Sequence, residues 1–238
     1  MEKGVEQKTL VFIPVSGANY CLDYCISSIR EAIPNVNVCI VGDSFRTIGH
    51  ARTAMCEAAN HLGEKYFCMI DSDILVPSNW LSESLKYMEA GVGAVFCKKL
   101  TNIKGLREFE EWCYRRERYP LVNSGRLDTA CAVFRTEAVQ GFKSNLESLE
   151  DLLLGEYIIS KGFSHVCIDL AVKHEGYGGS IKGYYKALRK DGASLRKLHR
   201  ASLLGLCASV FVMFFKAKRF KLFILRYRLM LLWGFLHE

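Results

Sequence analysis

Two carboxylates in the first third of the sequence, Asp71 and Asp73, have the spacing and context of a site for a hard metal ion. The residues before them, Tyr66 to Ile70, form a short apolar run that predicts a buried strand. In open α/β sheets, ligands bind where the strands end, which is where these carboxylates lie. Mg²⁺ and Mn²⁺ take such oxygen ligands and often bridge to substrate phosphates. The alternative is a surface turn in which Asp only favours the turn geometry. An EF-hand is excluded, because its other acidic positions and its central glycine are missing.

Further positions carry groups suited to phosphate or proton chemistry. Asp43 closes an earlier apolar strand, and Arg52 lies at the start of a helix, where a guanidinium and free N–H groups can meet a phosphate. Glu150 and Asp151 occupy the first turn of another predicted helix, and His174 follows the last predicted strand. Each has an ordinary explanation as a turn residue, a surface charge, a partner of the helix dipole or a structural histidine. Their occurrence together, in this order, favours a functional site.

The residues between these positions alternate between strand and helix patterns. The predicted strands are 9–15, 37–43, 66–70, 92–98, 129–135 and 164–172, and the predicted helices are 19–31, 48–62, 79–89 and 148–162. Segment 101–126 is charged and aromatic and indicates mixed loop and helix. Strands separated by helices indicate a mostly parallel sheet with both faces covered. The expected fold class is therefore α/β, with a Rossmann-like sheet flanked by helices.

Charge divides the chain into two parts. The 238 residues carry a net charge of +7, but residues 182–238 hold 13 Lys or Arg and 2 acidic residues, a net charge of +11, which leaves −4 for the rest. Half of the sequence is hydrophobic, enough for the core of one ordinary α/β domain with an appendage. We therefore expect a domain of residues 1–181 followed by a basic, apolar helical tail of residues 182–238.

The tail has the composition of a membrane-associating segment. Two apolar runs, 201–215 and 222–238, flank the basic segment 216–221. The first run is too short to cross a ~30 Å hydrocarbon core as a helix, and two arginines interrupt the second. Attachment to an anionic membrane surface is expected, and packing of the tail on the body or on another chain is the alternative. The apolar density makes lipid a better partner for the tail than nucleic acid.

The location expected for the protein is the cytoplasmic face of a membrane, as a peripheral or monotopic protein. The first ten residues are polar and charged, so no secretory signal is predicted. The ten cysteines are scattered and do not form a zinc-binding pattern, which indicates free thiols in a reducing compartment.

From residue 9 to about residue 180, the sequence resembles the nucleotide-sugar glycosyltransferases of the GT-A fold, in particular glycosyltransferase family 2. The resemblance lies in an ordered set of short elements. They are Pro14-Val15-Ser16 after the first strand, Asp43 after the second, Ala51-Arg52 at a helix start, Asp71-Ser72-Asp73 with Pro77 and Leu81 behind it, TACAVFRTEAVQGF (129–142), and Glu150-Asp151 with Gly162-Phe163. Two departures from the family pattern, Thr53 after the helix-start Arg and the short loop 41–44, concern the choice of nucleotide and donor.

The resemblance implies a role for each motif. Donor binding falls to Pro14, Val15, Ser16, Asp43, Arg52, Asp71, Ser72 and Asp73, and metal binding to Asp71, Asp73 and His174, with Mn²⁺ or Mg²⁺ as the ion. Asp151 would be the general base of an inverting sugar transfer, and Glu150 would orient the acceptor or the base. The donor would be a nucleoside-diphosphate sugar of the UDP or GDP type. The acceptor would be a glycan or a lipid-linked molecule presented at a membrane.

Two other functions compete with this interpretation. The residues FCMIDSDIL loosely resemble the first motif of haloacid-dehalogenase phosphatases, in which the first Asp is a nucleophile and the second an acid or base. That motif normally lies on the first strand and has Thr or Val where this chain has Leu75. The second alternative is a catalytically inactive domain of the same fold that serves as a scaffold at a membrane.

Overall fold

The computed structural model describes residues 9–15, 21–33, 35–42, 44–103, 105–115, 127–176, 180–198, 205, 207 and 221–237. Its centre is a seven-stranded sheet in the order β2-β1-β3-β6-β5-β7-β4. The strands are β1 (Leu10–Pro14), β2 (Asn37–Val41), β3 (Tyr66–Ile70), β4 (Ile74–Leu75), β5 (Val92–Thr101), β6 (Cys131–Arg135) and β7 (Ser164–His174). β6 runs antiparallel to both of its neighbours, and β4 runs antiparallel to β7, whereas the other pairs are parallel.

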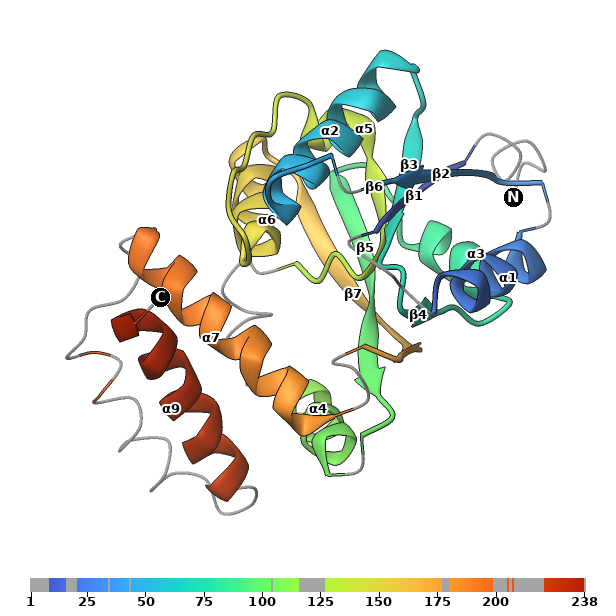
Figure 1. The fold of residues 1–238 in the computed structure, drawn as a ribbon. Coiled ribbons are helices and arrows are strands. Elements are labelled where there is room, and N and C mark those ends of the chain that lie inside the picture. The colour runs from blue at the N-terminus through green and yellow to red at the C-terminus, as the bar shows by residue number, and fades with distance from the viewer. Residues whose placement is uncertain are drawn as a thin grey trace.

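Helices cover both faces of this sheet (Figure 1). The helices of the body are α1 (Leu22–Ala32), α2 (Ile48–His61), α3 (Trp80–Lys86), α4 (Leu106–Arg115), α5 (Thr136–Val139) and α6 (Glu150–Ser160). α1 and α3 contribute to one hydrophobic cluster and α2, α5 and α6 to the other, so the sheet separates two cores. The α/β fold predicted from the sequence, with a mostly parallel sheet between helices, is confirmed.

The apolar strand runs follow from burial on both faces. In β1, Val11 and Ile13 belong to the first cluster, and Leu10 and Phe12 to the second. Successive side chains of a strand point to opposite faces, so a strand covered on both sides must be apolar throughout. The same pattern in β3 holds the strand rigidly in the centre of the molecule, and this fixes the position of Asp71 at its end.

Two helices of the tail pack tightly against each other. They are α7 (Ile181–Lys197) and α9 (Lys221–His237), and they lie side by side in Figure 1. The backbones approach closely at two glycines, because a Cβ on Gly192 would collide with the carbonyl of Leu231, and one on Gly234 with the carbonyl of Arg189. Glycine is required where two helix backbones come this near.

The tail also packs on the body. Tyr184 and Leu188 of α7 form a third buried cluster with Leu106 and Phe109 of α4. α7 therefore packs on the body, as in the alternative to membrane attachment that the sequence raised for the tail. Within the described ranges no helix is both long and apolar enough to cross a membrane. The apolar run 201–215 lies outside those ranges apart from Gly205 and Cys207.

Candidate donor and metal site

The two carboxylates at the end of β3 turn toward different partners. The Asp71 N–H donates to the carbonyl of Ala130 at 2.9 Å, and the Ile74 N–H donates to the carbonyl of Asp71 at 3.0 Å, which closes a tight turn. One oxygen of Asp71 pairs with Arg52, whereas Asp73 Oδ2 lies 3.3 Å from His174 Nε2. The predicted site thus contains two adjacent halves, one centred on a guanidinium and one on an imidazole.

Arg52 connects two carboxylate regions that are far apart in the sequence. Its side chain projects from the second turn of α2 and is buried, with only 1% of the residue exposed. Nη2 binds Asp71 Oδ1, and Nε lies 3.8 Å from Glu150 Oε1. Burial raises the pKa of Asp71, but the charges of Arg52 and Lys99 and the hydrogen bond from Arg52 together outweigh burial and hold that pKa below its usual value. Arg52 therefore keeps Asp71 ionised inside the protein.

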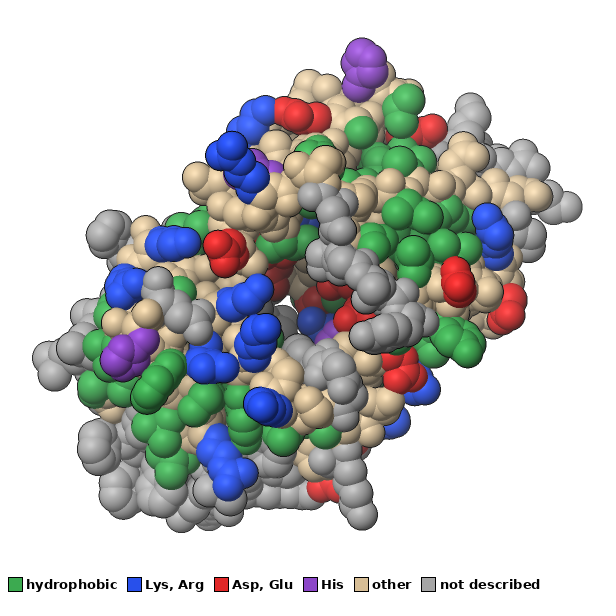
Figure 2. Space-filling view, viewed as in Figure 1, with side chains coloured by type: hydrophobic (Ala, Val, Ile, Leu, Met, Phe, Trp, Pro, Cys, Tyr) green, Lys and Arg blue, Asp and Glu red, His purple; other side chains and the backbone are tan. Residues whose placement is uncertain are grey.

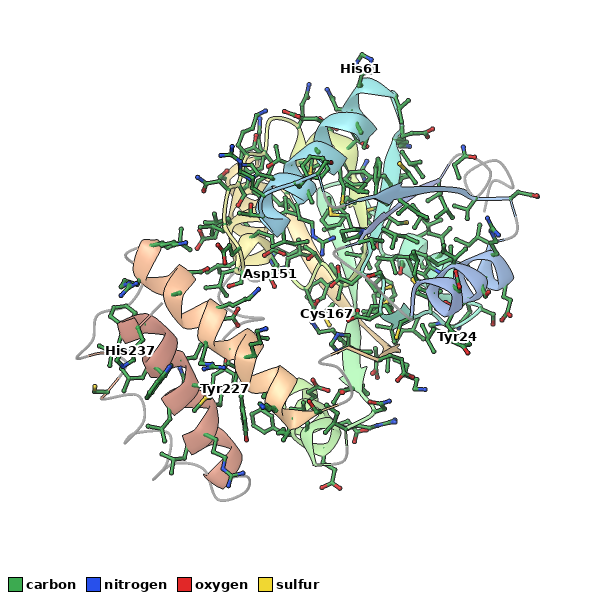
Figure 3. The ribbon with its side chains drawn as sticks, in the orientation of Figure 1. Tyr24, His61, Asp151, Cys167, Tyr227 and His237 are labelled. Carbon is green, nitrogen blue, oxygen red and sulfur yellow. The ribbon has the colours of Figure 1, made fainter. Side chains whose placement is uncertain are left out.

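Glu150 and Asp151 begin α6 and differ in environment. Glu150 is buried, and desolvation together with the charge of Asp151 raises its pKa to about 7, against the opposing charge of Arg52. Asp151 is half-buried, and its Oδ1 accepts from the N–H of Leu152 at 2.8 Å. Figure 3 shows Asp151 at the end of α6 that lies toward α7. Asp151 thus remains within reach of a ligand, and Glu150 lies behind it beside Arg52.

The residue before this pair has an unusual backbone. Leu149 has φ +62°, and among the described residues it is the only one other than glycine with a positive φ. Such a conformation costs on the order of 1 kcal/mol or more for a side chain of this size and persists only where packing enforces it. Leu149 is buried, and the turn at this residue directs α6 so that its first residues face Arg52.

The second half of the site suits a divalent cation. Asp73 Oδ1 is a buried oxygen without a hydrogen-bond partner among the described residues. The backbone of Gly176 lies close to the same pair, since a Cβ there would collide with Asp73 Oδ2 and His174 Nε2. A carboxylate with one oxygen beside an imidazole nitrogen and the other without a partner offers favourable ligands for Mn²⁺. Groups of three or more His, Cys, Asp or Glu side chains suited to a metal are absent from the described residues, so the remaining ligands would be diphosphate oxygens and water.

The structure places most of the predicted site residues at or beside the carboxyl ends of the parallel strands. Pro14 ends β1 and Val15 follows it, with the Val15 N–H donating to the carbonyl of Val41 at 2.9 Å. Ser72 is buried in the turn between the two aspartates. The predictions for Ser16 and Asp43 fall on residues outside the described ranges.

Sequence reasoning missed a polar group behind His174. Glu110 on α4 accepts from the Thr101 N–H at 2.7 Å, and Thr101 is the register partner of His174 across β5 and β7. Desolvation raises the pKa of Glu110 to about 7. Glu110 lies in the segment predicted as mixed loop and helix, where no pattern indicated which face of a helix would turn inward. It ties α4 to the strand pair that carries His174.

A hollow opens between the sheet and α7 (Figure 2). Acidic and histidine side chains lie within and beside it, and Lys and Arg side chains gather on its α7 rim. The body of the molecule thus presents carboxylates to this space and the tail presents cations. This arrangement could accommodate a metal-bound anion on one side and a second substrate on the other.

Comparisons with known proteins identify the architecture. No protein-family profile matches the sequence, and no curated protein sequence matches it either. Among solved structures, the chain is similar to a mannosyltransferase from Pyrobaculum calidifontis in complex with GDP-Man and Mn²⁺, with a TM-score of 0.68 and 12% identity. That similarity covers 96% of this chain and 86% of the other, so it includes most of the tail. Glucosyl-3-phosphoglycerate synthase from Mycobacterium tuberculosis matches over 71% of each chain with a TM-score of 0.48 and 13% identity. The chain has the fold of the GT-A glycosyltransferases.

Proposed function

We propose that the protein is a divalent-metal-dependent glycosyltransferase that takes a sugar from a nucleoside diphosphate of the GDP or UDP type. The observation that carries the proposal is the pair of Asp73 and His174 beside Asp71 and Arg52 at the end of β3, with one buried Asp73 oxygen that has no hydrogen-bond partner among the described residues. Support comes from the GT-A fold and from the GDP-Man and Mn²⁺ bound by the similar mannosyltransferase.

Donor and acceptor would bind on two different sides of the hollow. Asp73 and His174 would hold the cation, and a cation bound there neutralises negative charge on a leaving diphosphate. On the other side, Asp151 accepts the proton of the acceptor hydroxyl as its oxygen attacks the anomeric carbon. The new C–O bond forms as the bond to the diphosphate breaks, the nucleoside diphosphate departs, and the anomeric configuration inverts. Arg52 keeps Asp71 ionised and aligns Glu150 behind the base.

A screen by thermal shift tests this proposal directly. At a ligand concentration about 100 times Kd, binding adds about 2.7 kcal/mol to the free energy of unfolding, which should raise the Tm of a chain of this size by about 5 °C or more. We expect GDP, UDP or one of their sugars to produce this shift only when Mn²⁺ or Mg²⁺ is present. A complete nucleotide-sugar panel without any metal-dependent shift would favour the inactive scaffold. Hydrolysis of p-nitrophenyl phosphate that is lost in Asp71→Asn would favour the phosphatase.

We also propose that the tail holds the enzyme on the cytoplasmic face of a membrane, where a lipid-linked or other membrane-borne acceptor is presented. Leu229, Trp233 and Leu236 lie on one side of α9 and are exposed, with 51% of Trp233 accessible to solvent. Trp favours the membrane interface. The net charge of +11 after residue 181 adds attraction to anionic lipid, on the order of 1 kcal/mol for each basic group near the surface.

Vesicle flotation distinguishes attachment through α9 from nonspecific binding to lipid. The full-length protein should float with vesicles that contain phosphatidylserine, and salt should release it only in part because apolar burial is not screened. Replacing Leu229, Trp233 and Leu236 together with Ser should abolish most of the binding. A matched control replaces Leu62 and Ile159, exposed apolar residues of the body, and should float like the wild type. Protein that stays unbound at low salt, or a triple variant that floats normally, contradicts membrane attachment through α9.

A further inference from the structure

Three lysines form a row along α7. Lys182, Lys186 and Lys190 are spaced by four residues, so they lie one above another on the helix surface. All three are exposed, and none forms an ion pair with a residue in the described part of the chain. Like charges at this spacing destabilise a helix slightly. A row of cations without an ion-pair partner among the described residues is therefore available to an external anion.

A contact between α7 and the body fixes where this row lies. Ser194 of α7 is buried, and its Oγ lies 3.1 Å from the Oγ of Ser148. Ser148 precedes Glu150 by two residues and Asp151 by three. Lys190 lies four residues before Ser194, so it shares that side of α7 at a distance of about one helical turn, ~5.4 Å. The lysine row therefore approaches the hollow next to Asp151, in agreement with the cations on the α7 rim in Figure 2.

Packing of α7 against α4 and α9 fixes the side of the helix on which these lysines lie. Tyr184 and Leu188 bury the opposite side of α7 against α4, and Gly192 presses the helix against α9. The packing on both sides leaves the lysine row with one orientation. The row thus lies on the side of α7 that is next to Ser148 and the start of α6, which is where the proposed mechanism puts the acceptor.

We infer that the acceptor is an anionic molecule and that Lys186 and Lys190 bind a phosphate group on it, beside the base Asp151. This inference rests on the proposed function and names the substrate class for the same site. Lysine binds phosphate as a compact charge with several rotatable donors, which suits a flexible phosphate ester. The phosphate can belong to a soluble phosphorylated molecule or to the head of a lipid, and both offer the same group to the row.

Binding of defined phosphate esters tests the inference in the full-length protein. The protein is first saturated with Mn²⁺ and the nucleotide found in the thermal-shift screen. Calorimetry then compares three soluble probes at monomeric concentrations, which are glycerol 3-phosphate, octyl phosphate and octyl glucoside. We expect at least one phosphate ester to bind at least about tenfold more tightly than octyl glucoside. Tighter binding of octyl phosphate than of glycerol 3-phosphate indicates a lipid phosphate, and the reverse indicates a soluble acceptor.

Substitutions then identify the residues responsible. The double variant Lys186→Gln and Lys190→Gln should weaken phosphate-ester binding at least about tenfold and leave Mn²⁺-dependent nucleotide binding unchanged. Lys161→Gln is the matched control, because this exposed lysine follows the far end of α6, roughly 15 Å from Asp151 by helix rise. Equal binding of all three probes, or a double variant that loses nucleotide but not phosphate-ester binding, overturns the inference. If the wild type shows no metal-dependent nucleotide binding, the proposed function is overturned instead.

Discussion

An Asp151→Asn enzyme is expected to bind its nucleotide sugar as well as the wild type and to transfer the sugar at least about 100-fold more slowly. Asn keeps the shape of Asp and can still accept the Leu152 N–H through Oδ1, so the start of α6 should not change. It cannot take a proton from an acceptor hydroxyl. The measurement is transfer of label from a radioactive nucleotide sugar into the lipid and aqueous fractions of an extract of the source cells, with donor affinity measured in parallel.

A second Asp→Asn variant provides the control for this experiment. Asp169 on β7 has a side chain that is 95% exposed and pairs only with Lys98 among the described residues, so Asp169→Asn should transfer sugar at the wild-type rate. Product analysis adds an independent readout, because the proposed reaction inverts the anomeric configuration. An Asp151→Asn enzyme with normal transfer, or a product of retained configuration, contradicts the role assigned to Asp151.

Arg52→Met is expected to lower the free energy of unfolding by about 3–5 kcal/mol. Met fills much of the space of the buried side chain but leaves Asp71 and Glu150 without the cation that compensates their charge. Arg107→Met is the matched control, since Arg107 forms an exposed ion pair with Glu111 at 3.1 Å, and such pairs contribute about 0–1 kcal/mol. Denaturant unfolding measures both variants. If Arg52→Met does not fold, Arg52→Lys should fold with an intermediate loss, because it retains the charge.

The Arg52→Met loss should depend on pH in a defined direction. In the wild type the pKa of Asp71 lies below its usual value, so its ionised form stabilises the fold above about pH 4 and this contribution is lost as the pH falls. Without Arg52, burial should raise the pKa of Asp71 instead, and a buried acid with a raised pKa destabilises the fold as the pH increases. The difference between wild type and variant should therefore be smaller at pH 5 than at pH 8. An equal loss at both values, or a loss no greater than that of Arg107→Met, contradicts this account of Arg52.

Much of the fold could be predicted from the sequence, because strands that are buried on both faces appear in it as apolar runs. The apolar run from Tyr66 to Ile70 is a strand because both of its faces are covered, and Asp71 follows it as expected. The strand predicted over 129–135 was also correct and corresponds to β6. Its antiparallel insertion between β3 and β5 was not predicted, because direction in a sheet depends on distant pairings such as Cys68 with Val133.

The site was harder to predict, since its contacts join distant parts of the chain. Arg52 was predicted at a helix start where it can meet a phosphate, and that role stays a prediction, but its burial beside Asp71 and Glu150 was not foreseen. No local pattern distinguishes a surface arginine from one that closes a buried carboxylate pair. No sign of the turn at Leu149 appears in the sequence either. A leucine with a positive φ contradicts local preference and is held by packing alone.

The tail shows a signal that could have been used more fully. Gly192 and Gly234 interrupt two helical patterns, and an isolated glycine in a helix often marks a close approach of backbones. They lie where α7 and α9 touch. Residues 1–181 and 182–238 remain a predicted division of the chain, but α7 contributes to the same buried cluster as α4. Charge separates the two parts more sharply than packing does.

The central claim is that Asp73 and His174 bind a divalent cation that carries a nucleoside diphosphate, and calorimetry of GDP and UDP binding with and without Mn²⁺ tests it most directly. The account predicts binding of at least one nucleotide that requires Mn²⁺ in the wild type and in the Asp169→Asn control. It predicts that Asp73→Asn, which preserves side-chain shape but removes the charge from the buried oxygen, loses this metal-dependent binding at least about tenfold. Nucleotide binding that does not depend on Mn²⁺, or that persists unchanged in Asp73→Asn, would contradict the account.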